Sequence, residues 1–146
     1  MMKIKRLAPK DVEALYALGL QQFKGEYWYT KKFVRDSVLK PGYNYGLFEG
    51  NKLLGGILIQ QEDRPKLWIY FFIVEKSRRR EGIGTALLKT VEKLRIPGFN
   101  YLFVDFEPTD ILAKSFYVKN GFKLSATIKH WFGRGSHALL FFKQIY

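Results

Sequence analysis

The sequence predicts an α/β fold with the element order β-α-α-β-β-β-α-β-α-β-β. Three observations support this prediction: several short segments alternate apolar and polar residues as strands do, the segment from Ile83 has the period of an amphipathic helix, and Gly or Pro residues stand at the breaks. Because 47% of the 146 residues are apolar and no linker, repeat or low-complexity tract interrupts them, we expect residues 1–146 to form a single domain.

Changes of hydrophobic period and turn-forming residues set the bounds of each element. In chain order we expect a strand at 4–7, a helix opened by the turn at 8–11, a helix from the N-cap Thr30 to Pro41-Gly42, strands at 43–48 and 53–60 around Gly50-Asn51, a strand at 66–74, a helix from Ile83 to Pro97-Gly98, a strand at 101–106, a helix at 110–120 closed by Gly121, and a hairpin of 123–129 with 137–145. The strand at 66–74 is almost wholly apolar, so we expect it to be central and buried on both faces.

The balance of charge limits the classes of partner. Lys and Arg number 25 against 13 Asp and Glu, and the resulting net charge of +12 attracts anionic molecules. Nucleic acid, acidic protein surfaces and phosphorylated cofactors all meet this condition, and so does a surface that is basic only for solubility. Charge alone therefore does not choose between them.

Residue types that are missing exclude several chemistries. The chain has no cysteine, which excludes disulfides, thiolate metal sites and a thiol nucleophile, and with only His130 and His137 a histidine metal site is not expected. We therefore expect no metal. No stretch reaches the roughly 20 apolar residues of a membrane-spanning helix, and the N-terminus lacks the apolar core of a signal peptide. We expect a soluble, cytoplasmic protein with no membrane partner.

A turn rich in arginine and glycine joins the strand at 66–74 to the helix from Ile83. The run Arg79-Arg80-Glu81-Gly82-Ile83-Gly84 places free backbone N–H groups at the positive end of that helix. The two glycines let the backbone approach a phosphate and adopt conformations that a Cβ forbids, and the arginines and Thr85 add donors. A pyrophosphate fits this turn, although a plain helix start is the alternative. The pattern is neither a Walker loop nor a Rossmann fingerprint, so nucleotide hydrolysis is disfavoured.

At this turn the sequence resembles the GNAT superfamily of N-acetyltransferases, whose signature is Arg/Gln-x-x-Gly-x-Gly/Ala after a strand that ends in valine, here Val74. A second family pattern, Asn-x-x-Ala-x-x-x-Tyr-x-x-x-Gly-Phe, is matched by Asp110-x-x-Ala113-x-x-x-Tyr117-x-x-x-Gly121-Phe122. The resemblance covers nearly the whole chain. It implies a central mixed, mostly antiparallel sheet with a splayed, bulged central strand, and transfer of an acetyl group from acetyl-CoA to a primary amine by direct attack in a ternary complex.

The resemblance assigns the contacts with coenzyme A to three segments. Backbone groups at the end of the strand at 66–74 pair with the pantetheine arm, the turn holds the pyrophosphate with Arg78 facing solvent, and Ala113 is small where the cofactor passes. Asp110 replaces the asparagine that donates to pantetheine, and because a carboxylate only accepts, a plain helix N-cap is the alternative. The expected cofactor-binding residues are Phe72, Ile73, Val74, Arg79, Arg80, Glu81, Gly82, Ile83, Gly84, Thr85, Asp110, Ala113 and Tyr117.

Two residues are the expected catalytic groups. Tyr117 resembles the tyrosine that protonates the leaving thiolate in this family, with a core aromatic as the alternative. The strand at 66–74 has no carboxylate to act as the base that many relatives carry there. The segment at 104–110 resembles one in ribosomal-protein alanine acetyltransferases and places Asp105 at their proposed base, with Glu107 as a rival and an outward-facing polar residue as the alternative.

Aromatic residues are the candidates for the acceptor pocket. Residues 128–138 are loosely similar to a hairpin of protein N-terminal acetyltransferases, in which Trp131 and Phe132 take the place of a tyrosine pair and His137 replaces an acidic residue. A second wall is expected from Tyr27, Trp28 and Tyr29, or these residues form a lid packed on the core.

The strength of the base bears on the acceptor. A remote or weak base favours an amine of low pKa, and an α-amine titrates near pH 8 whereas lysine titrates near 10.4. We therefore expect a peptide N-terminus or a small amine as acceptor, with an acidic protein partner as an option and a monomer or homodimer as the assembly. The competing hypotheses are a basic module that binds nucleic acid and a GNAT fold that binds coenzyme A without catalysis.

Overall fold

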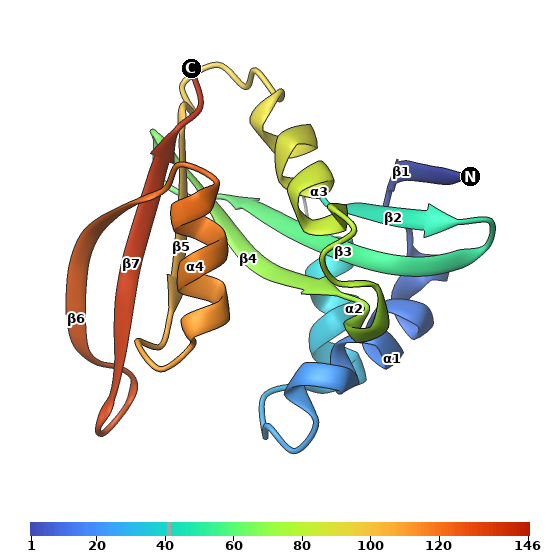
Figure 1. Cartoon of the computed structure of the whole chain (residues 1–146), viewed down its shortest axis with the longest axis horizontal. Coiled ribbons are helices and arrows are strands. Elements are labelled where there is room, and N and C mark those ends of the chain that lie inside the picture. The colour runs from blue at the N-terminus through green and yellow to red at the C-terminus, as the bar shows by residue number, and fades with distance from the viewer. Residues whose placement is uncertain (41) are drawn as a thin grey trace. The chain divides into compact units, whose positions relative to one another are not determined.

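The computed structural model describes residues 1–40 and 42–146 (Figure 1). Its strands are β1 (Met2–Arg6), β2 (Tyr45–Glu49), β3 (Lys52–Gln61), β4 (Lys66–Val74), β5 (Tyr101–Phe106), β6 (Lys123–Gly133) and β7 (Ser136–Gln144), and its helices are α1 (Val12–Phe23), α2 (Lys31–Leu39), α3 (Ile83–Glu92) and α4 (Ile111–Lys119), with short 3-10 helices at Pro9–Asp11 and Lys76–Arg78. The predicted order of elements is confirmed. Within the described residues the strands follow the order β1-β2-β3-β4-β5-β7-β6 in a mixed, mostly antiparallel sheet.

The chain divides into two compact units, and β4 contributes to both. The first unit holds residues 1–60 and 69–94, and the second holds residues 61–68 and 95–146. Among the described residues, no helix is long and apolar enough to cross a membrane.

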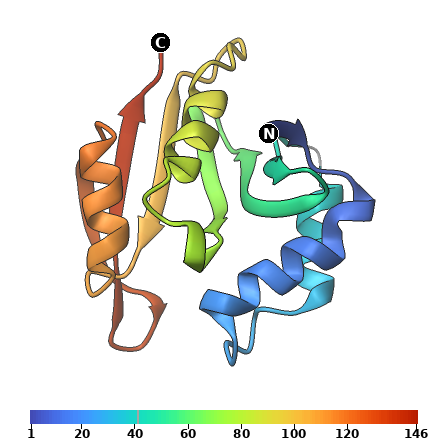
Figure 2. The same ribbon diagram turned by 45° about the vertical axis from the view of Figure 1, so that its right-hand side comes forward.

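The first unit is an antiparallel sheet covered by helices. Strand β2 pairs with β1 from Met2↔Glu49 to Arg6↔Tyr45 and with β3 from Tyr45↔Ile57 to Glu49↔Lys52. Helices α1 and α2 lie side by side (Figure 2). The apolar faces of these helices pack against the strands and form a hydrophobic core with them. Its buried residues are Val12, Leu15, Leu18, Tyr29, Val34, Val38, Phe48, Leu53, Leu58, Phe71 and Ile73.

Local sequence signals fix the ends of several elements in the first unit. The Thr30 hydroxyl caps α2 by accepting from the Phe33 backbone N–H at 3.0 Å, as predicted. The predicted stop at Pro41-Gly42 falls partly on Pro41, which lies outside the described residues; α2 ends at Leu39. The hairpin between β2 and β3 turns at Gly50, whose φ is 59°.

The second unit combines the start of β4 with β5, β7, β6 and α4. Strand β5 pairs in parallel with β4 from Lys66↔Tyr101 to Trp68↔Phe103 and antiparallel with β7 along its whole length. Strands β6 and β7 form a long hairpin (Figure 1). Helix α4 begins at the N-cap Asp110 and ends before Gly121, whose φ of 90° suits a left-handed C′ residue, as predicted.

Three predicted features differ in the structure. Strand β4 is fourth in the strand order as expected, but burial alternates along it and Tyr70 is 41% exposed, so burial on both faces was wrong. Helix α3 ends at Glu92 rather than at Pro97-Gly98, because Pro97 disfavours helical backbone before it and a bridge between Ile96 and Phe99 makes this segment a turn. Strand β6 continues beyond 129 to Gly133 through a bulge.

Candidate active site

The turn between β4 and α3 has the backbone geometry of an anion cradle. Arg80 and Gly82 both lie in the left-handed region, with φ of 71° and 81°. Gly82 is the N-cap of α3 and offers no side chain, so the first N–H groups of this helix have no side-chain cap. Alternation of left-handed residues before a helix N-terminus directs successive N–H groups toward one place. Gly84 differs from the prediction, because it lies inside α3 and needs no left-handed conformation.

Packing inside the first unit fixes the start of α3. Ile83 is 2% exposed and Leu87 is fully buried. A Cβ on Gly55 of β3 would lie 2.9 Å from the Ile83 side chain and 3.1 Å from Leu87. The glycine therefore lets the first turns of α3 approach the strand closely. This packing also fixes the position of the turn that precedes the helix.

The three arginines of the turn have different surroundings. Arg79 and Arg80 are exposed, and within residues 1–40 and 42–146 neither forms an ion pair. Arg78, expected to face solvent, instead donates to Glu49 at 3.0 and 3.1 Å and to Glu81 at 2.8 Å. These bonds hold the pKa of Glu49 below its ordinary value and raise that of Arg78. The sequence reasoning missed Arg78; its spacing of three from Glu81 is a local signal, but nothing in the sequence points to Glu49.

The other predicted cofactor-binding residues of the first unit differ in how deeply they are buried. On β4, Ile73 is buried in the core, whereas Phe72 and Val74 are half-buried. Glu81 is exposed and bound to Arg78, and Thr85 is half-buried in the first turn of α3. The predicted bulge in β4 stays a prediction.

Tyr117 lies in the aromatic interior of the second unit. Its side chain is 6% exposed, its ring stacks on Phe106 of β5 at 5.5 Å, and Phe122 contacts it edge-on at 5.1 Å. Burial raises the pKa of the phenol well above its ordinary value, and the nearby charges of Asp110 and Asp105 raise it further. The phenol is therefore protonated at neutral pH and able to donate a hydrogen bond.

Asp105 is half-buried on β5, and an indole contacts it. The Trp131 Nε1–H donates to Asp105 Oδ2 at 2.8 Å. Burial raises the pKa of this carboxyl, while the Trp131 hydrogen bond acts in the opposite direction because it favours the ionised form. A pKa moved upward toward neutrality is the direction that suits a general base. Asp105 is thus held in place by the hairpin of β6 and β7.

The acidic residues between β5 and α4 form hydrogen bonds within the protein. Glu107, the rival base, accepts a short hydrogen bond from the Ser136 hydroxyl. Asp110 Oδ1 accepts from the Ala113 backbone N–H at 3.1 Å, the N-cap geometry that the sequence offered as the alternative to a cofactor contact. Ala113 itself is half-buried.

The tip of the β6–β7 hairpin is exposed and held by histidines. Trp131 and Phe132 are 50% and 47% exposed. His137 Nδ1 accepts from the His130 backbone N–H, and His130 Nδ1 accepts from the Gly135 N–H, each at 2.9 Å. Among the described residues no group of three potential metal ligands occurs. The two histidines therefore shape the tip that presents the aromatic pair.

The aromatic residues between α1 and α2 divide into two kinds. Tyr29 is 5% exposed and donates to the Tyr16 carbonyl at 2.9 Å, so it packs on the core as the sequence offered in the alternative. Burial raises the pKa of its phenol. Trp28 is 36% exposed and packs edge-on against Tyr29, while Tyr27 is 93% exposed. Only Tyr27 and Trp28 are accessible from solvent.

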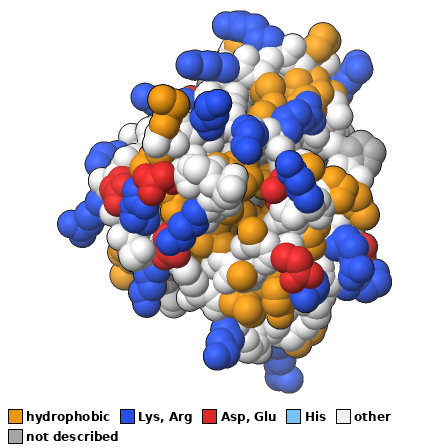
Figure 3. Space-filling view, turned by 90° about the vertical axis from the view of Figure 1, so that its right-hand side faces the viewer, with side chains coloured by type: hydrophobic (Ala, Val, Ile, Leu, Met, Phe, Trp, Pro, Cys, Tyr) orange, Lys and Arg blue, Asp and Glu red, His pale blue; other side chains and the backbone are white. Residues whose placement is uncertain are grey.

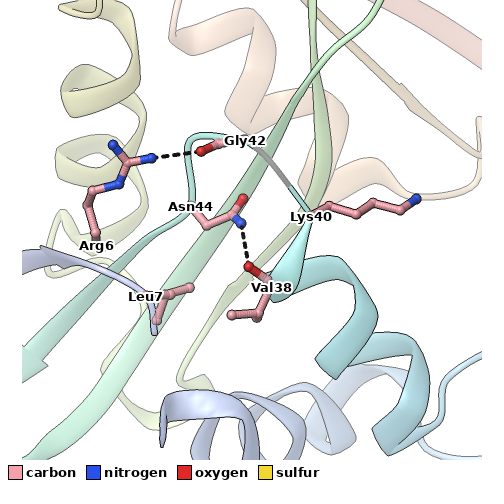
Figure 4. Close-up of a pocket in the computed structure, with 6 residues that line it drawn as sticks. All are labelled: Arg6, Leu7, Val38, Lys40, Gly42 and Asn44. Atoms are coloured by element: carbon pink, nitrogen blue, oxygen red, sulfur yellow. Dashed lines mark hydrogen bonds between the residues drawn. The ribbon is translucent and has the colours of Figure 1, made fainter. Parts of the chain in front are cut away.

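A separate pocket of about 210 Å³ lies in the first unit beside the end of α2 (Figure 4). Its polar groups bind one another: Arg6 donates to the Gly42 carbonyl at 2.7 Å, and the buried Asn44 amide lies 3.5 Å from the Val38 carbonyl. None of the predicted site residues lines this pocket. These contacts join the segment before β2 to β1 and to the end of α2, and they serve the fold.

Basic side chains are spread over one face of the molecule (Figure 3). On the side that carries the N-terminus and the turn between β2 and β3, Lys and Arg are scattered among apolar and neutral atoms and acidic side chains are few (Figure 3). A spread of this kind differs from the basic stripe that follows a nucleic-acid backbone.

A family model now decides the class of this protein. The model of the "Acetyltransferase (GNAT) family" matches residues 11–122, and this stretch includes the glycine turn, Asp105 and Tyr117. The chain belongs to the GNAT family of acetyltransferases. It is therefore an acyltransferase, and the family resemblance read from the turn and from the Asp110–Phe122 pattern is confirmed.

Individual relatives agree with this membership. An uncharacterized N-acetyltransferase of Methanocaldococcus jannaschii is 28% identical over 145 residues, covering 98% of this chain and 92% of that protein. The structure of Ard1 from Thermoplasma volcanium superimposes with a TM-score of 0.88 at 24% identity, covering 99% of this chain and 98% of that one.

Two further structures share the fold. The ribosomal-protein-S18-alanine N-acetyltransferase of Escherichia coli gives a TM-score of 0.83 at 20% identity and covers 99% and 94% of the two chains. The PaiA N-acetyltransferase of Thermoplasma acidophilum, solved in complex with coenzyme A, gives 0.81 at 21% identity and covers 99% of each chain. The predicted GNAT fold is confirmed.

Proposed function

We propose that this protein transfers the acetyl group of acetyl-CoA to a primary amine by direct attack in a ternary complex, with a protein or peptide N-terminus or a small amine as acceptor. Family membership supports acetyl transfer. The observation that carries the donor is the turn before α3, where a left-handed Gly82 stands at a helix N-terminus with no side-chain cap. Arg79 and Arg80 precede it, and within the described residues neither forms an ion pair. The relative solved with coenzyme A supports the same donor.

Each segment has a proposed part in holding the donor. The turn from Arg79 to Thr85 binds the pyrophosphate through its N–H groups, and Arg79 and Arg80 bind it through their guanidinium groups. The backbone of residues 72–74 pairs with the pantetheine arm as an added strand would. Ala113 leaves room for the cofactor, and Asp110 contributes as the N-cap of α4.

Asp105 and Tyr117 have complementary roles in the reaction. The acceptor amine loses a proton to Asp105, directly or through a water, and its lone pair attacks the thioester carbonyl carbon. The C–N bond forms, the C–S bond breaks, the sulfur leaves with the electron pair, and the positively charged nitrogen gives its second proton to solvent. Tyr117 donates a hydrogen bond to this thiolate and passes it a proton as the charge develops. Because its pKa is raised, the hydrogen bond is the larger part of its role.

The proposed acceptor follows from the base and from the exposed aromatic residues. A carboxylate is a weak base, so an amine that is partly neutral at physiological pH, such as an α-amine, is the better nucleophile. Trp131 and Phe132 in the second unit, and Tyr27 and Trp28 in the first, are accessible to contact an acceptor, while Tyr29 contacts Trp28 edge-on. The net charge of +12 suits an acidic protein as acceptor or partner.

We extend the proposal to the organisation of the chain. The family match includes residues of both compact units, which supports a single N-acetyltransferase domain over residues 1–146. We place its activity in the cytoplasm, where acetyl-CoA is available, with neither a membrane nor a nucleic acid as partner and with a monomer or homodimer as the active form.

The decisive experiment measures thiol release from acetyl-CoA with a panel of amines. The panel contains peptides with free N-termini, the same peptides with blocked N-termini and a lysine, polyamines and aminoglycosides. We expect turnover with α-amines or small amines, little with lysine, and a fall in kcat of about 100-fold for Tyr117→Phe. Tyr43→Phe, which removes a phenol oxygen outside the proposed site, is the matched control and should match wild type.

Two results would contradict the proposal. Equal thiol release by Tyr117→Phe and wild type would remove the tyrosine from the mechanism. Tight binding of coenzyme A without turnover of any amine would make this a GNAT fold that binds the cofactor without catalysis.

A further inference from the structure

We propose that Arg78 is a positioning residue: anchored to Glu49 of β2, it keeps the Glu81 carboxylate away from the anion cradle at the start of α3. The inference rests on the proposed function in one respect, namely that the turn at 79–85 receives the pyrophosphate of acetyl-CoA.

The guanidinium of Arg78 joins two carboxylates from different elements. Its two terminal nitrogens donate to the two Glu49 oxygens at 3.1 and 3.0 Å, and its Nε donates to Glu81 Oε2 at 2.8 Å. Glu49 is the last residue of β2 and is paired in register with Met2 and Lys52, so its backbone is fixed to the sheet. The Arg78 side chain is only 25% exposed. This fork geometry fits a rigid bridge better than a single surface ion pair does.

A second set of bonds fixes the segment just before Arg78. Gln21 of α1 donates to Glu75 Oε1 and accepts from the Lys76 backbone N–H, both at 2.9 Å. Glu75 also accepts from the Ser77 N–H at 3.0 Å. The chain between β4 and α3 is therefore tied to α1 at its start and to β2 at Arg78.

Glu81 would compete with the cofactor if it were released. It directly precedes the N-cap Gly82, and a carboxylate near a helix N-terminus is attracted by the same dipole and N–H groups that attract a phosphate. In the structure Glu81 is held by Arg78 instead. Arg79 and Arg80 are exposed, and among residues 1–40 and 42–146 neither has an ion-pair partner, so their charges are available for the cofactor. Arg78 thus pairs with Glu81, the acidic side chain of residues 79–85.

The test compares two donors that differ in the pyrophosphate. Steady-state kinetics are measured with acetyl-CoA and with S-acetylpantetheine, which lacks the pyrophosphate and nucleotide, for wild type, Arg78→Gln, Glu81→Gln and the double variant. We expect Arg78→Gln to raise the KM for acetyl-CoA about tenfold at low salt, and less at high salt, since the freed carboxylate repels the phosphates. The KM for S-acetylpantetheine should stay within about twofold, because the effect acts on the pyrophosphate alone.

The double variant gives the sharpest result. If Glu81 competes for the cradle once Arg78 is gone, then Arg78→Gln with Glu81→Gln restores the KM for acetyl-CoA to within about twofold of wild type. Arg35→Gln, which removes an exposed positive charge on α2, is the matched control and should leave both KM values unchanged. Thermal unfolding of each variant shows whether the fold is intact.

Three outcomes overturn the inference. No rescue by Glu81→Gln means that Arg78 does not act through Glu81. An equal rise of KM for both donors means a general loss of structure, and an equal effect of Arg35→Gln means a loss of net charge. Arg79→Gln separates these outcomes from a failure of the proposed function. If Arg79→Gln leaves the KM for acetyl-CoA unchanged, and wild type does not prefer acetyl-CoA to S-acetylpantetheine, the turn is not the pyrophosphate site.

Discussion

Single hydrogen bonds set the chemistry of the proposed catalytic residues. The Trp131 indole donates to Asp105, whose pKa burial raises, so two opposite influences act on one carboxyl. The ionised form is the one that accepts both the indole hydrogen bond and a proton from the acceptor amine. The protonation of Asp105 should therefore limit activity on the acid side of the pH profile.

Replacing Trp131 should shift the acid limb of the pH profile. In Trp131→Phe the ionised carboxylate loses a donor, so the pKa of Asp105 rises further and the acid limb of kcat/KM shifts to higher pH. The measurement is the pH dependence of kcat/KM for the acceptor amine, at a saturating concentration of acetyl-CoA. Asp105→Asn is the companion variant and should abolish the limb altogether. An acid limb at the wild-type position in Trp131→Phe would show that the indole does not act on the base.

The sequence allowed prediction of those residues whose signals are local. Asp110 and Tyr117 belong to one helix with a recognisable spacing, and Thr30 caps its helix three residues before its partner. Arg78 was wrongly expected to face solvent, because its partner Glu49 is 29 residues away and pairing over that distance depends on how β2 and the turn meet in space. The burial of Tyr29 was left open for the same reason.

At the scale of elements, replacing Asp110 tests whether its carboxylate caps α4 or contacts the cofactor. Asp110→Ala removes the bond to the Ala113 N–H, and we expect a loss of about 1 kcal/mol in the free energy of unfolding. The KM for acetyl-CoA should change by less than about twofold. Chemical denaturation and steady-state kinetics measure the two quantities.

Asp110→Asn serves as the control for this prediction. Asparagine is as good an N-cap as aspartate, so stability should be retained, and its amide adds the donor that the family places beside pantetheine. A large rise in KM for Asp110→Ala without a loss of stability would assign the carboxylate to the cofactor and reverse our interpretation.

The ends of elements were less predictable than their order. Every expected strand and helix is present, because hydrophobic period and turn residues are strong local signals. Helix α3 nevertheless ends before Pro97, since the backbone ahead of a proline resists helical geometry and a bridge between Ile96 and Phe99 competes for this segment. Strand β6 runs on to Gly133 because its pairing with the predicted partner β7 continues through a bulge to Gly133↔Ser136.

At the scale of the whole molecule, the excess of positive charge raises the question of which anion the protein prefers. Coenzyme A at about 100 times its Kd should raise the free energy of unfolding by about 2.7 kcal/mol, because it binds only the folded chain. Urea denaturation with coenzyme A, with duplex DNA and with neither measures this difference. Protection by DNA that vanishes at high salt, together with no protection by coenzyme A, would instead favour a nucleic-acid-binding module.

The outer strand of the β6–β7 hairpin also bears on how the protein behaves at high concentration. The strand order puts β6 at one edge of the sheet, and most of its residues are exposed. A long free edge invites a second chain to add a strand, and repeated addition leads to aggregation. Lys123 and Lys129 place charges along this edge, and the left-handed His130 interrupts its run of backbone donors and acceptors. The same bulge that presents Trp131 at the hairpin tip thus helps to keep neighbouring molecules apart.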